Sequence, residues 1–475
     1  MLGGIMAAMK RREALKRIGT AAAAIPAAFM ATGSAAKADG KRPNIIFLLS
    51  DDQRWDALGC MGNPIIKTPS IDRLASNGTL FRNSYVTTPI CCTSRASFLT
   101  GQYACRHGID DFFTDFTPEV LNTTYPMIMR DNGYYTGFVG KYGVGNKPET
   151  MPEDRFDAWY GFPGWGTYEQ TDEDGNYRHL TRIMGDQCLD FLENAPDDKP
   201  FNLSVSFKAP HVQDEDERQF IPDPAYDDLY ADIDIPVAET ADDKYFKAMP
   251  EFLRTSEARV RWKMRFPTPE KHQRSVKNYY RLITGIDVVV GDMMKKLDEL
   301  GIADNTVIVY MSDNGFYLGE HGFAGKWFGH EESIRVPLII HDPRTAKCYQ
   351  GRELDEMALN IDIAPTILSL AGINVPDTMQ GKNLMPLVQG DSVDWRHDFL
   401  FEHHFDSHPL IAKSEGVVGE QYKYLKYYEL NPSYEELYDT VNDPLEKNNL
   451  AHDLRYMDVI TRLRARLTEL KADYR

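Results

Sequence analysis

An unbroken apolar run near the N-terminus, residues 44–50 (NIIFLLS), is followed at once by Asp51 and Asp52. Because the run has no polar alternation, it predicts a strand buried on both faces, as in the interior of a parallel sheet. Side chains that directly follow such a strand lie at its carboxyl end, where open α/β sheets form their binding sites. The run therefore predicts an α/β fold with two carboxylates at a candidate site.

Strand and helix patterns alternate from this run to about residue 385. Further strands are predicted at 79–86, 134–139, 201–207, 306–311 and 336–341, and helices at 68–77, 127–132, 179–194, 273–300 and 362–371. After residue 390 the pattern changes to antiparallel strands, at 399–405 and 415–428, and a terminal helix at 461–471. This order predicts a large, mostly parallel sheet flanked by helices, with a small C-terminal α+β subdomain.

One long segment, residues 212–272, has no clear periodicity and is predicted to be irregular. Long loops are usually functional or disordered, and we favour a substrate-facing excursion over a structural wrap. Its acidic run at 214–217 is predicted to be solvated.

The N-terminal segment has the features of an export signal. Arg11 and Arg12 precede an alanine-rich run, and Ala36-Lys37-Ala38 offers a cleavage site. These features predict a twin-arginine signal over 1–38, with a basic disordered tail as the alternative. We expect a periplasmic or secreted protein, with a catalytic domain over 39–390 and a subdomain over 391–475. No later run is apolar enough to predict a transmembrane segment.

Charge and cysteine content restrict the function further. The 475-residue chain has a net charge of −18, which argues against nucleic acid as a partner. The same charge repels anions, so an anionic substrate would need a local positive pocket. The six cysteines form no zinc-like pairs, and the sequence allows one or two disulfide bonds among them.

A cysteine stands four residues before an arginine in the stretch 89–101 (PICCTSRASFLTG). Cys91 is predicted to lie at a helix N-terminus, where free N–H groups and the helix dipole favour an anion. Arg95 adds a fixed positive group beside the thiol. A plain thiol of low pKa is one interpretation of this arrangement.

The stretch also resembles the signature of the type I sulfatases, C-x-P/A-S-R-x-x-x-x-T-G, whose fold is alkaline-phosphatase-like. The resemblance implies that Cys91 is oxidised to formylglycine (3-oxoalanine) by a formylglycine-generating or anaerobic sulfatase-maturating enzyme. One hydroxyl of the hydrated aldehyde then attacks sulfur, and the second releases sulfate as the aldehyde re-forms. Thr93 departs from the pattern, since Pro or Ala is usual there.

Oxygen-bearing side chains follow two predicted strands, Asp51 and Asp52 after one and Asp313 and Asn314 after the other. Hard oxygen ligands suit Ca²⁺ or Mg²⁺. The resemblance implies calcium at these four residues, in contact with the modified Cys91. The alternative is that they only cap the strand ends.

Two lysines and Arg95 carry over from the resemblance as sulfate-binding and positioning groups. Lys141 lies in a GKYG stretch that is similar to the family's G-K-W-H-L-G, and Lys326 follows an LGEHG stretch at 318–322. Both are implied to contact sulfate, while Arg95 is implied to hold formylglycine and the calcium ligands. The family's usual histidine falls on Gly143.

Four histidines are further candidates. Pro210-His211 resembles the family's P-H-x-P, which implies that His211 protonates the leaving alcohol, as a general acid near sulfate would. His321 is expected at the rim of the sulfate site. His403 and His404, with His408 nearby, fall where relatives often contact sugar, although they could equally form a polar surface strand.

These features predict a sulfuric ester hydrolase that acts on a sulfated glycan. A phosphonate or phosphodiester hydrolase of the same fold is one alternative. A non-catalytic relative that binds sulfated glycans is another, motivated by the departures at Thr93 and Gly143.

Overall fold

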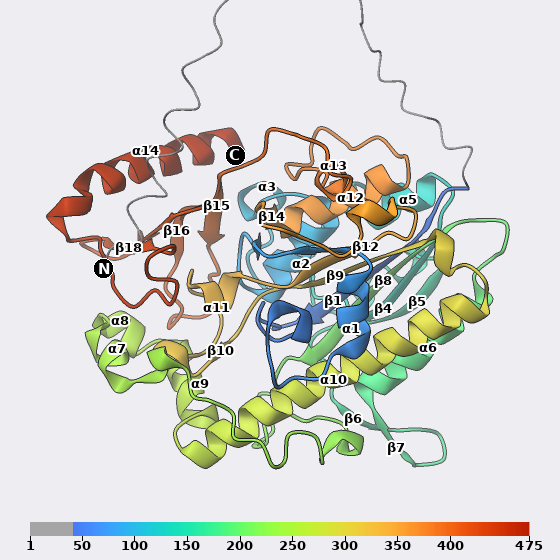
Figure 1. Cartoon of the computed structure of the whole chain (residues 1–475), viewed down its shortest axis with the longest axis horizontal. Helices are drawn as coiled ribbons and strands as arrows, with labels where there is room; N and C mark the ends of the chain where they lie inside the picture. The colour runs from blue at the N-terminus through green and yellow to red at the C-terminus, as the bar shows by residue number, and fades with distance from the viewer. Residues whose placement is uncertain (1–40, 475) are drawn as a thin grey trace, which may run out of the picture. The chain divides into compact units, whose positions relative to one another are not determined.

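A central sheet of eight strands organises the protein (Figure 1), whose computed structural model describes residues 41–474. The predicted export signal at 1–38 lies outside the described residues. The strand order is β13-β2-β12-β9-β1-β8-β4-β5. Of these described strands only β12 runs against its neighbours, so the predicted mostly parallel sheet is confirmed. The bounds are β1 Asn44–Asp51, β2 Thr79–Phe81, β4 Tyr135–Lys141, β5 Ala158–Phe162, β8 Phe201–Pro210, β9 Thr306–Ser312, β12 Leu338–His341 and β13 Arg352–Leu354.

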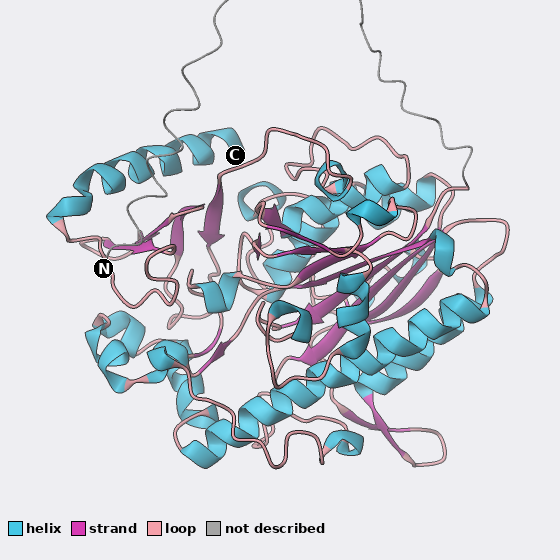
Figure 2. Cartoon of the chain, in the orientation of Figure 1, coloured by secondary structure: helices cyan, strands magenta, loops and turns pink. Residues whose placement is uncertain are grey.

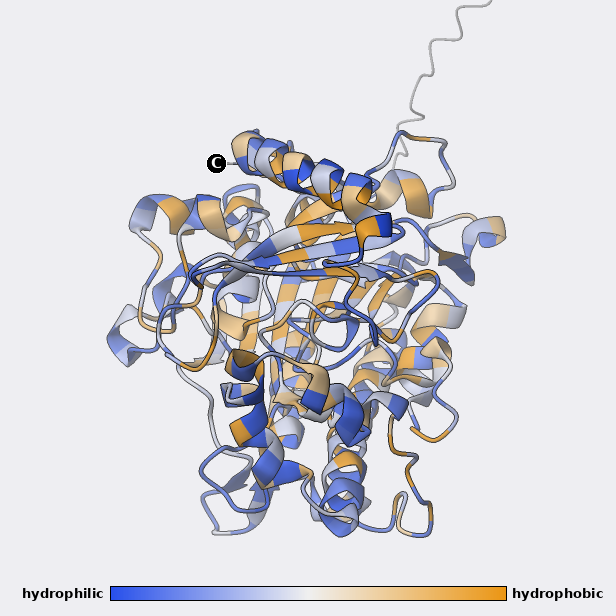
Figure 3. Cartoon of the chain, turned by 90° about the vertical axis from the view of Figure 1, so that its left-hand side faces the viewer, coloured by the Kyte–Doolittle hydropathy of each residue, from blue (hydrophilic) through white to orange (hydrophobic). Residues whose placement is uncertain are grey.

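Strand β1 lies between β9 and β8 and is buried along its whole length. Its side chains alternate between two hydrophobic cores: Phe47 and Leu49 enter one, and Ile46 and Leu48 the other. The apolar strands are visible as orange ribbons inside the molecule (Figure 3). Burial on both faces explains why the run lacks the alternation of a half-exposed strand.

Helices cover both faces of the sheet (Figure 2). Helices α1 (Pro69–Ser76), α6 (Leu180–Asn194) and α10 (Pro269–Glu299) pack into the core that holds Ile46. Helices α2 (Cys91–Thr100), α5 (Tyr125–Asp131) and α12 (Ile363–Leu370) pack into the core that holds Phe47. The three-layer arrangement leaves the carboxyl ends of the parallel strands as the edge where a site can form.

A second sheet is formed by four antiparallel strands: β15 (Asp398–His403), β16 (Ser414–Gly419), β17 (Tyr422–Tyr427) and β18 (Tyr434–Asp439). Helix α14 (Met457–Tyr474) packs on it. This sheet shares a hydrophobic core with one face of the central sheet, and the chain from Arg42 onward forms one compact unit. The subdomain boundary near residue 390 stays a prediction.

The segment 212–272 is less irregular than its sequence suggested. It contains the short helices α7 (Asp243–Ala248), α8 (Glu251–Arg254) and α9 (Glu257–Arg265), and α10 begins at Pro269. Helices of this length complete too few turns to give a clear periodic signal, which is why the prediction was wrong here.

The described residues contain all six cysteines, and no disulfide joins them. The one or two disulfide bonds that the sequence allowed are therefore not formed in this structure. None of the helices in residues 41–474 combines the length and the apolar character needed to span a membrane.

Candidate functional site

The carboxyl ends of the central strands bring several predicted site residues together. Asp51 ends β1, Asp313 follows β9, Lys141 ends β4, and His211 follows β8. Because these strands are parallel neighbours, their ends meet at one edge of the sheet. Cys91 is added from the first residue of α2.

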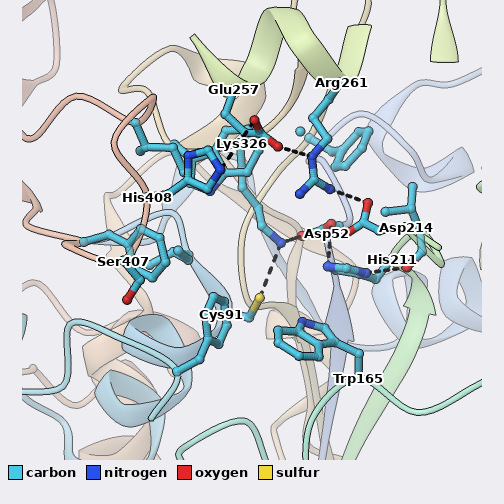
Figure 4. Close-up of a pocket in the computed structure, with 18 of the residues that line it drawn as sticks. Asp52, Cys91, Trp165, His211, Asp214, Glu257, Arg261, Lys326, Ser407 and His408 are labelled. Carbon is cyan, nitrogen blue, oxygen red and sulfur yellow. Dashed lines mark hydrogen bonds and ion pairs between the residues drawn. The ribbon is translucent and has the colours of Figure 1, made fainter. Parts of the chain in front are cut away.

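Cys91 lies at the base of a cavity and is almost fully buried. The Lys326 ammonium donates a hydrogen bond of 3.4 Å to its Sγ atom (Figure 4). Burial nonetheless raises the pKa of the Cys91 thiol, although Lys141 and Lys326 act to lower it. The interpretation of Cys91 as a plain thiol of low pKa is therefore not supported.

The carboxylates of Asp51, Asp52 and Asp313 converge, with one oxygen of each within 4.8 Å of the others. Two buried side-chain oxygens at this cluster have no hydrogen-bond partner: Oδ1 of Asp51 itself and Oδ1 of the neighbouring Asn314. An unpaired buried oxygen is costly unless something binds it, so this donor set fits a hard divalent cation.

The backbone of Asp52 adopts a left-handed conformation with φ of 70°. Its N–H donates to Asp313 Oδ1 at 3.1 Å, and its carbonyl accepts a hydrogen bond of 2.7 Å from the Tyr279 hydroxyl. Residues other than glycine rarely adopt this conformation unless neighbouring contacts hold them there. These two contacts turn the Asp52 side chain toward the cavity and toward Lys326.

Arg95 lies behind the carboxylates and is itself buried. Its guanidinium pairs with Asp313 at 2.8 Å and with Asp51 at 3.3 Å, and it also donates to the Lys141 carbonyl at 2.7 Å. These bonds join the ends of three strands. Burial together with the Asp51 charge raises the pKa of Asp313 to about 7, even though Arg95 opposes the shift.

Gly143, which stands where the family has histidine, lies against the Arg95 side chain. A Cβ atom at Gly143 would lie 2.3 Å from Arg95 Cδ, and its backbone has φ of +76°. Both the close contact and the backbone conformation would strain a larger residue at this position. The glycine at position 143 therefore fits the close packing of the Arg95 side chain against it.

Both predicted sulfate-binding lysines contact the carboxylate cluster. Lys141 Nζ lies 2.6 Å from Asp51 Oδ2, and Lys326 Nζ pairs with Asp52 Oδ1. Burial acts to lower the pKa of each lysine, but the neighbouring carboxylates outweigh it and raise both. The two side chains therefore carry positive charge at the site.

The His211 ring is oriented by its own neighbours. Nδ1 hydrogen-bonds the Val212 carbonyl at 2.6 Å, which leaves Nε2 on the cavity side, 3.6 Å from Asp52 Oδ2. Burial lowers the pKa of His211 to about 4, against the effect of the Asp52 and Asp51 charges. The protonated form that a general acid requires is thus not favoured by the protein alone.

The cavity above Cys91 has a volume of about 250 Å³ and draws its walls from distant parts of the chain. Phe112 and Phe113 come from the segment between α3 (Ala104–His107) and α4 (Pro118–Asn122). Trp165 comes from the loop after β5, Glu257 and Arg261 from α9, and Ser407 and His408 from the loop after β15 (Figure 4). The remaining lining residues are Asp52, Ile90, His211, Val212, Asp214, Arg265, Phe316, Gly325, Lys326, Trp327, Phe405 and Ile411.

The segment 212–272 supplies a charged wall to this cavity. Asp214 Oδ1 pairs with Arg261 and, at 2.6 Å, with Arg265, while Glu257 Oε1 accepts from Arg261 at 2.6 Å. Partial desolvation acts to raise the pKa of Asp214, but Arg265 and Arg261 outweigh it and lower the pKa to about 2. Asp214 is therefore an ion-paired residue of the wall whose side chain is still 39% exposed, and Glu215 and Glu217 are exposed as well, so the predicted solvated run at 214–217 is confirmed.

Three predicted substrate-binding histidines do not line the cavity. His321 is buried and stacks on His330 with ring centroids 4.7 Å apart. His403 is fully buried in the second sheet, and His404 hydrogen-bonds Tyr428 at 2.7 Å. The nearby residue that does line the cavity is His408.

Comparison with known proteins identifies the family to which the sequence is similar. The family model described as Sulfatase matches residues 43–373, and a second model, described as N-sulphoglucosamine sulphohydrolase, C-terminal, matches residues 319–473. The chain is 28% identical to an N-acetylglucosamine-6-O-sulfatase of Bacteroides thetaiotaomicron, over 95% of this chain and 90% of that protein. It is also 28% identical to an arylsulfatase of Clostridium perfringens, over 89% and 93% respectively.

Solved structures agree with this assignment. A protein in complex with its substrate D-glucosamine-2-N,6-O-disulfate superposes with a TM-score of 0.78 at 27% identity, covering 91% of this chain and 98% of that one. A phosphonate monoester hydrolase of Agrobacterium radiobacter shares the fold, with a TM-score of 0.75 at 21% identity over 91% and 96%. Because the family model covers well over half of the sequence, the chain belongs to the sulfatase family.

Proposed function

We propose that this protein hydrolyses a sulfate ester of a carbohydrate, with Cys91 converted to formylglycine and a calcium ion held by Asp51, Asp52, Asp313 and Asn314. The observation that carries the proposal is the position of Cys91. Its side chain lies at the base of the cavity, 3.4 Å from Lys326 Nζ and beside a carboxylate cluster with an unpaired buried oxygen.

The residues present suit both groups. Asp51, Asp52 and Asp313 offer carboxylate oxygens and Asn314 offers its unpartnered amide oxygen, as hard cations prefer, and the modified Cys91 would adjoin them. When in place, the ion supplies positive charge and the hydrated aldehyde supplies a nucleophilic oxygen with a route for release.

The chain's own side chains bind and orient the ester. Lys326 faces the cavity, so its ammonium can contact a sulfate oxygen, and Lys141 adds charge from β4. Because Asp52 would bind the cation, its pairing with Lys326 would weaken and leave Lys326 available for sulfate. Fixed positive groups around the transferring sulfate stabilise charge where it develops. Arg95 holds the ends of β1, β4 and β9 in register for this task.

His211 is proposed as the group that protonates the leaving oxygen. Its Nδ1 is occupied by the Val212 carbonyl, so Nε2 is the nitrogen that can carry a proton to the substrate. A sugar alkoxide is a strong base and needs that proton as the S–O bond breaks.

A carbohydrate substrate is supported by the relatives, of which one is an N-acetylglucosamine-6-O-sulfatase and another binds a disulfated glucosamine. The fold alone is also compatible with phosphonate ester hydrolysis. A sulfate ester and a phosphate ester of the same alcohol separate the two. We expect a higher kcat/KM on the sulfate ester, and a higher value on the phosphate ester would overturn the proposal.

A non-catalytic role is tested by the same assay. Protein that carries the aldehyde and calcium, and that binds sulfated glycans without releasing sulfate, would favour a binding relative.

Cleavage near Asp39 and export to the periplasm or beyond are also proposed, from residues 1–38. N-terminal sequencing of exported protein checks this, and retention of Arg11 and Arg12 would contradict it.

A further inference from the structure

The charges that line the cavity balance one another. The lining includes the cations Arg261, Arg265 and Lys326 and the carboxylates Asp52, Asp214 and Glu257. In Figure 4 the guanidinium of Arg261 lies between the last two carboxylates. Each of the three cations thus has a carboxylate partner.

Only one of these pairs would open during catalysis. Asp52, the partner of Lys326, is a proposed metal ligand, so Lys326 becomes available to the substrate. Arg261 and Arg265 keep their own partners, because Asp214 and Glu257 are not among the proposed metal ligands. Among the described lining residues, no arginine is left to neutralise a second anionic group.

The two wall carboxylates also leave room for hydroxyl donors. Asp214 uses its Oδ1 atom for both arginines, and Glu257 uses its Oε1 atom for Arg261. The other Glu257 oxygen, Oε2, lies 3.7 Å from His408 Nε2. A carboxylate oxygen with spare capacity accepts a hydroxyl proton but repels a sulfate or a uronate.

The mouth of the cavity is aromatic. Phe112 packs on Trp165 with ring centroids 5.3 Å apart and on Phe405 at 5.5 Å. Trp165 is 41% exposed and Phe113 is 61% exposed, so both rings present apolar surface to solvent where they line the cavity. Exposed aromatic faces at a cavity rim suit a partner with an apolar face, such as the C–H face of a sugar ring.

From these observations, and resting on the proposed function, we infer that the substrate unit is a neutral sugar ring with a single sulfate. Its sulfate points to Cys91 and Lys326, its hydroxyls face Asp214 and Glu257, and its apolar face lies on Trp165. The cavity of about 250 Å³ is below the usual range for small-molecule sites, which favours one terminal ring rather than the interior of a glycan chain.

Binding to the Cys91→Ser protein tests this without turnover. Calorimetry is run with the monosulfated isomers of galactose and N-acetylglucosamine, each against its counterpart with one additional sulfate. We expect at least one monosulfated sugar to bind, on the order of tenfold more tightly than its disulfated counterpart. Equal or tighter binding of the disulfated sugar, or no binding of any sugar, would overturn the inference. The proposed function has its own readout, which is sulfate release by the wild-type enzyme.

Glu257→Gln in the same background sharpens the test. The substitution keeps the side-chain volume, removes one negative charge and leaves Arg261 with Asp214 alone. We expect the preference for the monosulfated sugar to fall at least about threefold. Glu299→Gln, an exposed residue of α10, is the control and should leave the preference unchanged. An unchanged preference in Glu257→Gln would contradict the charge argument.

Trp165→Ala tests the aromatic rim separately. Because Trp165 is partly exposed, we expect the variant to fold, which circular dichroism checks. Binding of the monosulfated sugar should weaken by about 2- to 10-fold. Unchanged affinity would remove Trp165 from the binding surface.

Discussion

This protein contains two clusters of buried charged side chains, one beside the cavity and one away from it. One, at the ends of β1 and β9, gathers Asp51, Asp52 and Asp313 beside a cavity. The other lies against the second sheet, where Lys423 of β17 pairs with Glu331 of α11 (Glu331–Ile334) at 2.7 Å and with Glu446, after β18, at 2.8 Å. Lys423 is fully buried, and a further bond of 2.7 Å links the Glu331 N–H to Glu446.

The difference between the clusters is what their charges face. In the first cluster three carboxylates converge, and Cys91 and Lys326 open onto the cavity. In the second cluster one lysine satisfies two carboxylates from separate segments and none of the three lines that cavity. Burying charge is costly in both places, so we expect the first cluster to serve chemistry and the second to hold α11 against the second sheet.

Asp313→Ala should have the largest effect on activity. It removes a convergent carboxylate and the main partner of Arg95, so we expect sulfate release to fall to background. Bound calcium should be lost while the circular dichroism spectrum stays close to wild type. Asp304→Ala, before the opposite end of β9, is the matched control. Full activity with calcium retained would refute the site assignment.

His211→Ala should affect esters according to their leaving group. General acid assistance contributes ~10²–10⁴-fold, so kcat/KM on a sugar sulfate should fall by that order, and far less on a nitrophenyl sulfate. An equal loss on the two esters would mean that His211 only binds sulfate, because ground-state and transition-state contacts would then disappear together.

Lys423→Met should reverse the pattern, with a loss of stability and little loss of activity. It leaves Glu331 and Glu446 buried without their cation, which typically costs about 3–5 kcal/mol. Denaturant unfolding measures the cost, and Lys426→Met, half-buried on the same strand, is the control. If kcat/KM of the folded variant fell more than a few-fold, the separation of the two clusters would be wrong.

Glu436, near the second cluster, should give a smaller, pH-dependent effect. Burial raises its pKa from 4.5 to about 8, although a hydrogen bond from Tyr427 opposes the shift. The folded protein therefore holds this proton more tightly than the unfolded chain between these pH values. Its contribution to stability is present below pH 4.5 and is lost as the pH rises toward 8.

Glu436→Gln removes that titration. We expect the thermal midpoint of the variant to decline less than that of the wild type between pH 5 and pH 8. Parallel declines in the two proteins would show that Glu436 does not titrate in this window.

Local patterns predicted the parts of the site that depend on one strand or one turn. The unbroken run at 44–50 is β1, and Cys91 is the first residue of α2, as its stretch indicated. Asp51 and Asp313 lie at the same edge of the sheet because β1 and β9 are parallel neighbours and each residue stands at the carboxyl end of its strand. These placements need no knowledge of distant contacts.

The cavity walls could not be predicted in the same way. Trp165, Arg261 and His408 are far apart in sequence and meet only through the packing of three segments. His403 and His408 illustrate the limit: the strand pattern could not tell that the side chain of His403 enters the core while the following loop returns His408 to the cavity. The reason for Gly143 likewise appears only when Arg95 is seen beside it.

Sulfate release tests the central claim most directly. The full chain and its Cys91→Ala variant are each produced together with a formylglycine-generating enzyme and incubated with monosulfated sugars and calcium. Free sulfate is then measured by ion chromatography. The account predicts release by the wild-type protein and background release by the variant, whereas equal release by the two would show that Cys91 is not the centre of the reaction.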